Sequence, residues 1–256
     1  MVDINNATCY MFADSYSGSG DWLDEAGSND AALVNSPAHT SGPGGYFTLN
    51  GTNERFDISN HADITPSTSS YTVGMGLYLD SGGSGTDTVW SKYDGAGKGY
   101  IADYDNSSRI RGHSGDGTLK FDDTSAPSED TNITYIMRVD KVADELESFL
   151  NGVGTGSPDD ITGIGSVDNS DTLSLGFFGA AYMKGRIFSF AFIKSALTGG
   201  EIGTGVGTLH YQLLNQTTAG ASAFTGHWGT RVAAWVMAGT SGLWLPDTAS
   251  DLLDML

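Results

Sequence analysis

The sequence predicts an all-β protein, an antiparallel two-sheet sandwich followed by a C-terminal extension containing short helices. Runs in which apolar residues occur at every second position recur along the chain, whereas helical periodicity is scarce. Clusters such as DSGGSGTD, YDGAGKG and NGVGTGS, drawn from 36 glycines and many polar turn formers, separate these runs. Many short strands divided by such turns are typical of a β-sandwich.

The first clear strand is predicted at residues 71–79. The alternation there places one set of apolar side chains on a single face: Tyr71, Val73, Met75, Leu77 and Leu79. A strand with this pattern buries that face against a core.

A hairpin is predicted next, with strands at residues 133–140 and 145–151 joined by a turn at 141–144. Its first strand places Ile133, Tyr135, Met137 and Val139 on one face. The acidic stretch DELE, residues 144–147, falls at the solvated end of this hairpin, and Asn151-Gly152 begins the next turn. We therefore interpret DELE as a hairpin end and not as a cluster of catalytic carboxylates.

The last strand of the sandwich is predicted in the run RIFSFAFI. Alternation assigns Phe188, Phe190 and Phe192 to one side. The other side receives Ile187, Ser189, Ala191 and Ile193. Apolar residues on both sides indicate a strand that is covered on both faces.

Five segments of the chain resemble the laminin-G-like jelly rolls of the concanavalin A-like lectin/glucanase superfamily. They read YFTLNGTNERFDIS, SYTVGMGLYLD, YIMRVDK with LESFLNGV, SDTLSLGFFG, and YMKGRIFSFAFIKSALTGGEI. The resemblance runs from about Ala7 to Gly203 and implies that residues 1–205 form a jelly-roll sandwich of two packed sheets. One departure is Gly76, where many relatives carry a tryptophan.

Residues 206–256 fall outside the resemblance and are predicted to be an extension for docking or oligomerisation. TLHYQLLN suggests a short helix and DTASDLLDML a capped terminal helix. The apolar residues expected at an interface are Trp228, Trp235, Trp244, Leu252 and Leu253. The alternative is that the extension folds back and covers its own sandwich.

Charge and composition limit the partners of the chain. A net charge of -19 argues against binding to nucleic acid or to an anionic membrane surface. No apolar run approaches 18 residues, so membrane insertion is not expected. Cys9 is the single cysteine, so no disulfide forms within the chain.

Catalytic motifs are absent from the sequence. The glucanase branch of the superfamily uses a Glu-x-Asp-x-x-Glu strand, which places carboxylates on one face of a cleft. The chain has six glutamates, and none is followed two residues later by aspartate. Signatures of zinc proteases, serine hydrolases and nucleotide-binding loops are missing as well. We therefore predict no catalytic residues, with paired aspartates from separate strands left open.

A calcium site is suggested by the resemblance alone. Relatives often bind Ca²⁺ near the segment that reads DWLDEAGSNDAAL here, and Asp24, Asn29 and Asp30 are the matching oxygen donors. An Asx-rich turn without metal is the alternative.

A glycan site is suggested by aromatic residues among polar ones. Trp90, Tyr93, Tyr100 and Tyr104 lie close in sequence to Asp94, Asp103, Asp105 and Asn106. Exposed aromatic rings beside carboxylates and amides are typical of carbohydrate binding. The alternative is that alternating aromatics pack a core.

Three functions remain open. The first is a non-enzymatic virion structural or recognition protein, on a phage surface as head decoration or tail component. It is motivated by an isolated jelly roll, an acidic surface, an aromatic extension and an N-terminus, MVDINNATCY, unlike a secretory signal. Its partners would be other virion proteins, copies of itself in an oligomer, or a cell-surface glycan. The alternatives are a carbohydrate-binding module of an extracellular bacterial protein and a glycoside hydrolase lacking the usual glutamate motif.

Overall fold

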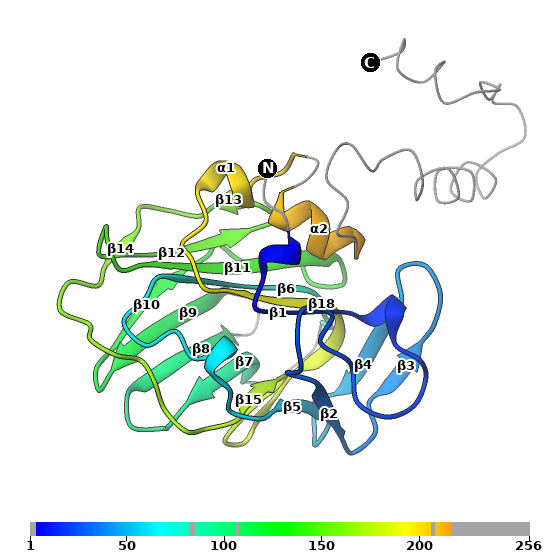
Figure 1. Cartoon of the computed structure of the whole chain (residues 1–256). Coiled ribbons are helices and arrows are strands. Elements are labelled where there is room, and N and C mark those ends of the chain that lie inside the picture. Colours follow the sequence, from blue (N-terminus) through cyan, green and yellow to red (C-terminus); the bar gives the residue numbers. More distant parts are fainter. Residues whose placement is uncertain (1–3, 82–84, 106–107, 206–207, 217–256) are drawn as a thin grey trace, which may run out of the picture. The chain divides into compact units, whose positions relative to one another are not determined.

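The structure is a computed structural model that describes residues 4–81, 85–105, 108–205 and 208–216 (Figure 1). All described residues belong to one compact unit, Met1–Thr218. Two large antiparallel sheets make up most of that unit, which confirms the all-β prediction. The predicted interface residues Trp228, Trp235, Trp244, Leu252 and Leu253 lie outside the described residues.

The larger sheet has nine strands. Its main path runs β13 (Val153–Gly154), β12 (Glu145–Leu150), β11 (Asn132–Asp140), β6 (Tyr71–Leu79), β18 (Lys184–Ile193), β4 (Tyr46–Asn50) and β3 (Ala38–Thr40). Off this path, β1 (Cys9–Phe12) pairs with β18, and β14 (Asp159–Asp160) pairs with β12.

The smaller sheet has seven strands. They follow the order β10 (Leu119–Asp123), β9 (Arg109–Asp116), β8 (Lys98–Asp105), β7 (Thr86–Tyr93), β15 (Leu173–Leu175), β5 (Arg55–Ile58) and β2 (Ala31–Val34). A two-stranded ribbon of β16 (Phe177–Phe178) and β17 (Ala181–Tyr182) follows β15.

Late strands occupy central positions in both sheets. β18 lies between β6 and β4 in the larger sheet, and β15 lies between β7 and β5 in the smaller one. Segments that are far apart in the sequence are thereby joined through the last strands of the sandwich.

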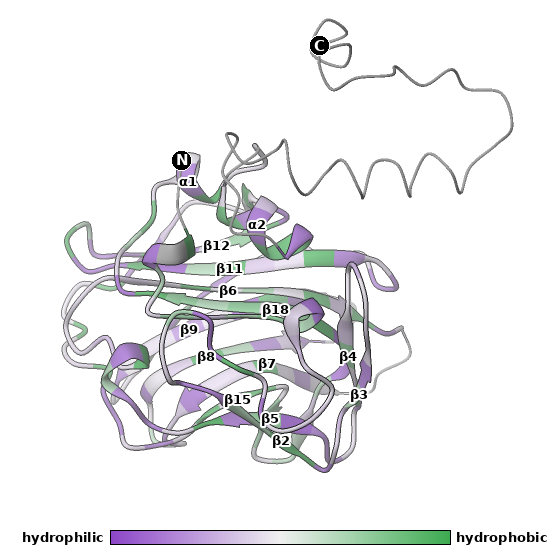
Figure 2. Cartoon of the chain, turned by 45° about the vertical axis from the view of Figure 1, so that its right-hand side comes forward, coloured by the Kyte–Doolittle hydropathy of each residue, from purple (hydrophilic) through white to green (hydrophobic). Residues whose placement is uncertain are grey.

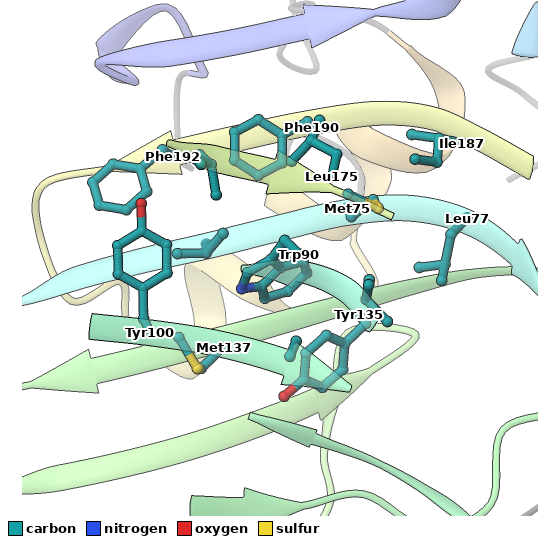
Figure 3. Packing of buried hydrophobic residues seen from close by; sticks show 14 of the residues in the cluster. Met75, Leu77, Trp90, Tyr100, Tyr135, Met137, Leu175, Ile187, Phe190 and Phe192 are labelled. Carbon is teal, nitrogen blue, oxygen red and sulfur yellow. The ribbon is translucent and has the colours of Figure 1, made fainter. Parts of the chain in front are cut away.

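The core fills the space between the two sheets (Figure 3). It contains the predicted inward faces of β6 and β11, which are confirmed as buried. Aromatic rings dominate it: Trp90 stacks on Tyr135 with ring centroids 5.2 Å apart, and Tyr100 packs on Phe192 at 5.5 Å. Burial of apolar area on this scale supplies the main stabilising free energy of such a fold.

The predicted alternation along β18 is corrected by a β-bulge. The register to β6 shifts between Ile187 and Ser189, so one residue is inserted into the ladder. Ile187, Phe190 and Phe192 consequently face the core, whereas Phe188 packs against Tyr46 with ring centroids 5.9 Å apart. A bulge reverses the phase of alternation, which a simple count of every second residue misses.

The outer face of the larger sheet is covered as well. The 3₁₀-helix η1 (Ile4–Asn6) and the helices α1 (Gly199–Ile202) and α2 (Leu209–Asn215) lie on this side (Figure 1). α2 carries hydrophobic and hydrophilic residues (Figure 2), and its Leu209 and Leu213 are fully buried in a second apolar cluster with Ile136 and Ile193. This covering confirms that β18 is buried on both faces.

The position of α2 explains the glycine at position 76. A Cβ atom there would lie 2.6 Å from Ser189 Oγ and 3.0 Å from the Leu213 carbonyl oxygen. The side chain of Gln216 also bonds to the backbone of Asp14 and Gly45, at 2.8 and 2.9 Å. Residues 208–216 therefore cover their own sandwich, beyond the boundary at residue 205 that the sequence suggested.

The hairpin of β11 and β12 forms as predicted. Its turn occupies residues 141–144, where Asp144 adopts a left-handed conformation with φ of 57°. Arg138 forms ion pairs with Glu145 at 2.9 Å and Glu147 at 2.8 Å. The acidic stretch is thus held by a neighbouring arginine at the end of a hairpin.

Candidate functional site on the open face of the smaller sheet

The outer face of the smaller sheet differs from that of the larger sheet, because neither α1 nor α2 packs on it (Figure 1). Strand register defines which residues lie side by side on this face. One cross-strand row consists of Phe121, His113, Ile101, Ser91, Ser174 and Asp57. The adjacent row consists of Asp123, Arg111, Asp103 and Thr88.

Asp103 is the centre of a hydrogen-bonded network on this face. Arg111 donates to Asp103 Oδ1 from Nε at 2.8 Å and approaches it with Nη2 at 2.7 Å. His113 Nε2 donates to Asp103 Oδ2 at 2.9 Å. Burial by itself raises the pKa of Asp103, but the bonds from His113 and Arg111 outweigh it and lower the pKa overall. The carboxylate stays ionised and fixes both partners in place.

An ion pair and an exposed ring border this network. Arg109 forms an ion pair with Asp123 across β9 and β10. Phe121 is 50% exposed, and its ring centroid lies 5.7 Å from that of His113. We call the set of these side chains the β8–β10 face: Asp103, Arg109, Arg111, His113, Phe121 and Asp123.

The ribbon of β16 and β17 limits the open surface on one side. Both of its strands pack against β7, and Phe178 contacts Tyr93 with ring centroids 5.2 Å apart. Arg55 lies over the ring of Phe177 at 4.6 Å. Ser91 on β7 is accordingly buried, and Ile101 on β8 is only 7% exposed, so the exposed part of this face lies mainly over β9 and β10.

Three of the four aromatic residues predicted to bind a glycan are core residues. Trp90 is 0% exposed, and Tyr100 and Tyr104 are each 1% exposed. A ring without exposed surface has no contact with a ligand from solvent, so the core-packing alternative holds for these three. Tyr93 is half-buried beside Phe178.

Sequence reasoning missed most of the β8–β10 face. The signal was available in the segment RIRGHSG, where Arg109, Arg111 and His113 recur at every second position. Such spacing places all three side chains on one face of a strand. Their partner Asp103 was noted only as a neighbour of the aromatic residues.

The segment predicted to bind calcium forms a hydrogen-bonded turn. Asp24 Oδ1 accepts from the backbone N–H groups of Tyr10 at 3.0 Å and Ala26 at 2.9 Å. Asp24 Oδ2 accepts from the backbone and side-chain nitrogens of Asn29, at 3.1 and 2.9 Å, and Asp30 accepts from the Asp24 N–H at 2.8 Å. N–H donors thus occupy the lone pairs that a hard cation needs. This arrangement fits the Asx-turn alternative better than a calcium ion.

One buried carboxyl has a strongly shifted pKa. Burial raises the pKa of Asp122 to about 6, although hydrogen bonds from Ser148 oppose the shift. A raised carboxyl pKa is typical of catalytic acids, and also of structural groups. Asp122 is buried between β10 and β12, where its carboxyl accepts from the Ser148 N–H. It joins the two sheets, and the structural role is the better supported one.

A shallow depression of about 470 Å³ lies beside β2 and β3. It is lined by Tyr16, Gly18, Gly20, Leu33, Ser36, Pro37 and His39. Two of its polar side chains are engaged within the protein: Tyr16 donates to the Gly20 carbonyl at 3.1 Å, and His39 Nε2 donates to that of Ala13 at 2.8 Å. This depression is a weaker candidate than the β8–β10 face.

Residues 4–81, 85–105, 108–205 and 208–216 contain no group of three or more His, Cys, Asp or Glu side chains arranged to hold a metal ion. Among the same residues, no helix has the length and apolar character needed to cross a membrane.

The comparisons with known proteins rest on structure. No protein-family model matches the chain, and no curated protein matches its sequence. The binding domain of Paraclostridial Mosquitocidal Protein 1 is similar in structure, with a TM-score of 0.65 at 13% identity over 83% of this chain and 53% of that one. The botulinum neurotoxin serotype G binding domain gives 0.64 at 12% identity, over 80% of this chain and 50% of that one.

A sialidase has a similar β-sandwich. Trypanosoma rangeli sialidase, in complex with 2,3-difluoro-KDN, gives a TM-score of 0.60 at 13% identity over 82% of this chain and 33% of that one. This chain therefore spans about half the length of the toxin binding domains and a third of the sialidase. At such identities the likeness establishes a lectin-like β-sandwich fold and nothing finer.

Proposed function

We propose that this chain is a non-enzymatic carbohydrate-binding module with a concanavalin A-like jelly roll, and that the β8–β10 face binds the glycan. The observation that carries the proposal is the Asp103–Arg111–His113 network beside the half-exposed ring of Phe121. Sugar hydroxyls need fixed donors and acceptors, and the apolar face of a sugar ring packs on an aromatic ring. Both are present on an uncovered sheet face.

Preorganisation supports this assignment. Asp103 holds the guanidinium of Arg111, so the remaining N–H groups of that guanidinium are presented with little further loss of side-chain entropy, while His113 helps to fix the Asp103 carboxylate. Structurally similar proteins include toxin binding domains, one of them solved in complex with the acidic sugar N-acetylneuraminic acid, and this likeness supports glycan binding in general without specifying the class of sugar. A binding module acts on an extracellular or cell-surface glycan, which agrees with the second of the three functions predicted from the sequence.

Substitution of Phe121 tests the proposed site. On a glycan array, the full chain should bind a subset of oligosaccharides, and Phe121→Ala should weaken that binding about tenfold or more, because a stacked aromatic anchor is lost. Val142→Ala is the matched control, since Val142 is an apolar residue with 92% exposure at the β11–β12 turn. Equal binding by both variants would place the glycan elsewhere.

The non-enzymatic part of the proposal has its own test. Prolonged incubation with the bound oligosaccharide should release no new reducing ends, because the sequence lacks the glutamate pattern of the glucanases. Turnover that disappears on substitution of one Asp or Glu would show instead that the chain is a glycoside hydrolase.

The virion-surface function stays a prediction. The structural neighbours described above are toxin binding domains and a sialidase, and none of the three is a virion protein. Detection of this chain in purified phage particles would support that function, and it is compatible with glycan binding by the same face.

A further inference from the structure

We infer that the β8–β10 face selects uncharged saccharides and discriminates against sugars that carry a carboxylate or sulfate. This inference rests on the proposed function and specifies its ligand class. The observations that carry it are the charge balance of the face and the pairing of each of its two arginines with a protein carboxylate.

The cationic groups of the face are already neutralised. The guanidinium of Arg111 is paired with Asp103, and that of Arg109 is paired with Asp123. An anionic ligand that approaches either guanidinium therefore also meets the protein carboxylate already paired with it. Repulsion from Asp103 or Asp123 offsets the attraction to the arginine.

The carboxylates on and directly beside the face outnumber its guanidinium groups. Asp105 pairs with Arg109 in the strand register and adds a third carboxylate beside Asp103 and Asp123, against two arginines. His113 donates to Asp103 through Nε2, and its Nδ1 is buried, so the ring offers an anionic ligand no further hydrogen bond.

The electrostatic field of the whole molecule also disfavours anionic ligands. The chain has 31 acidic and 12 basic side chains, a net charge of -19, and this excess repels an approaching anion. A hydroxyl group, by contrast, both accepts from a guanidinium N–H and donates to a carboxylate. Neighbouring hydroxyls of a neutral sugar therefore suit a surface on which donors and acceptors alternate.

Paired ligands test the inference. The full chain is applied at low salt to an array that carries each neutral oligosaccharide beside its uronic acid or sulfated counterpart. We expect the acidic member of each pair to bind at least tenfold more weakly, with the difference shrinking near 1 M salt, where the Debye length is about 3 Å. The variant Asp105→Asn removes the carboxylate whose register partner, Arg109, forms its ion pair with Asp123, and it should reduce the ratio of neutral to acidic binding.

The outcomes separate the two proposals. Equal or tighter binding of acidic members at low salt overturns the selectivity, while glycan binding itself stands. Absence of binding to every oligosaccharide overturns the proposed function. Discrimination that is unchanged by both salt and Asp105→Asn also overturns the inference, because it would arise from shape and not from charge. Asp21→Asn, an exposed aspartate outside this face, serves as the charge-matched control.

Discussion

At the scale of single residues, polar groups of this sandwich are placed where they hold neighbouring segments together. Lys92 is nearly fully buried, and its ammonium donates to carbonyl groups of Asn169 and Asp171 at 3.0 and 2.8 Å. Burial lowers the pKa of Lys92 to about 8. Asp122 likewise holds two segments together, because its carboxyl on β10 accepts a hydrogen bond from the Ser148 N–H on β12.

Asp122 should make stability depend on pH. Its pKa is raised from 3.8 to about 6, so the folded state binds a proton more tightly than the unfolded state does. The stabilisation from this group is complete below pH 3.8 and is lost as pH rises through about 6. In chemical denaturation at a series of pH values, the stability of Asp122→Asn relative to the natural chain should increase between pH 4 and 7.

Asp21→Asn is the control for that measurement, because Asp21 is exposed. A constant difference between Asp122→Asn and the natural chain over the whole pH range would contradict the assigned pKa. The comparison isolates one group, since the other carboxyls whose pKa is raised by burial, such as Glu25 and Asp87, are present in both proteins.

Asp24 should stabilise the fold without metal. Its carboxylate accepts four hydrogen bonds from backbone and amide N–H groups, so Asp24→Ala should lower the free energy of unfolding by about 2 kcal/mol or more. Thermal melts of the natural chain in calcium and in chelator should coincide. A melting temperature that rises with calcium, and does so only while Asp24 is present, would establish the calcium site instead.

At the scale of elements, helix α2 is part of the sandwich. It closes the outer face of the larger sheet through Leu209 and Leu213, and Ser189 donates to the Leu213 carbonyl at 2.7 Å. Its N-terminus is capped by Thr208, whose side chain accepts from the Tyr211 N–H. A helix of seven residues gains its stability from such packing more than from its own sequence.

The two adjacent leucines of α2 test this role. Leu213→Ala should lower the free energy of unfolding by about 2–5 kcal/mol, since it removes a fully buried side chain. Leu214→Ala should change it by less than about 0.5 kcal/mol, because Leu214 is 37% exposed. Similar values for both variants in denaturant titrations would show that α2 does not cover the sheet in solution.

Local patterns predicted the parts of this fold that depend on neighbouring residues. The inward faces of β6 and β11 and the turn after Asp140 follow from alternation and turn chemistry alone. The alternation predicted for β18 was wrong at Phe188, because the β-bulge there arises from pairing with the partner strand β6. The β8–β10 face was missed because a row across strands depends on which strands pair and in which register, and alternation within one strand does not identify its partners.

At the scale of the whole molecule, the excess of acidic groups should itself affect stability. A net charge of -19 produces self-repulsion in the compact state, and salt screens it. The melting temperature should therefore rise between about 0.1 and about 1 M sodium chloride, as the Debye length falls from about 10 to about 3 Å. A melting temperature that falls over this range would mean that favourable ion pairs, such as Arg111 with Asp103, outweigh the repulsion.

The central position of β18 has a consequence for synthesis on the ribosome. About a hundred residues separate the end of β6 at Leu79 from the start of β18 at Lys184. At roughly 5–20 residues per second, the β18-facing edge of β6 waits on the order of 5–20 s for its partner. During that interval the nascent chain exposes an unpaired, apolar strand edge, which is the kind of surface that chaperones protect from aggregation. The sandwich closes only after its last long strand has been made.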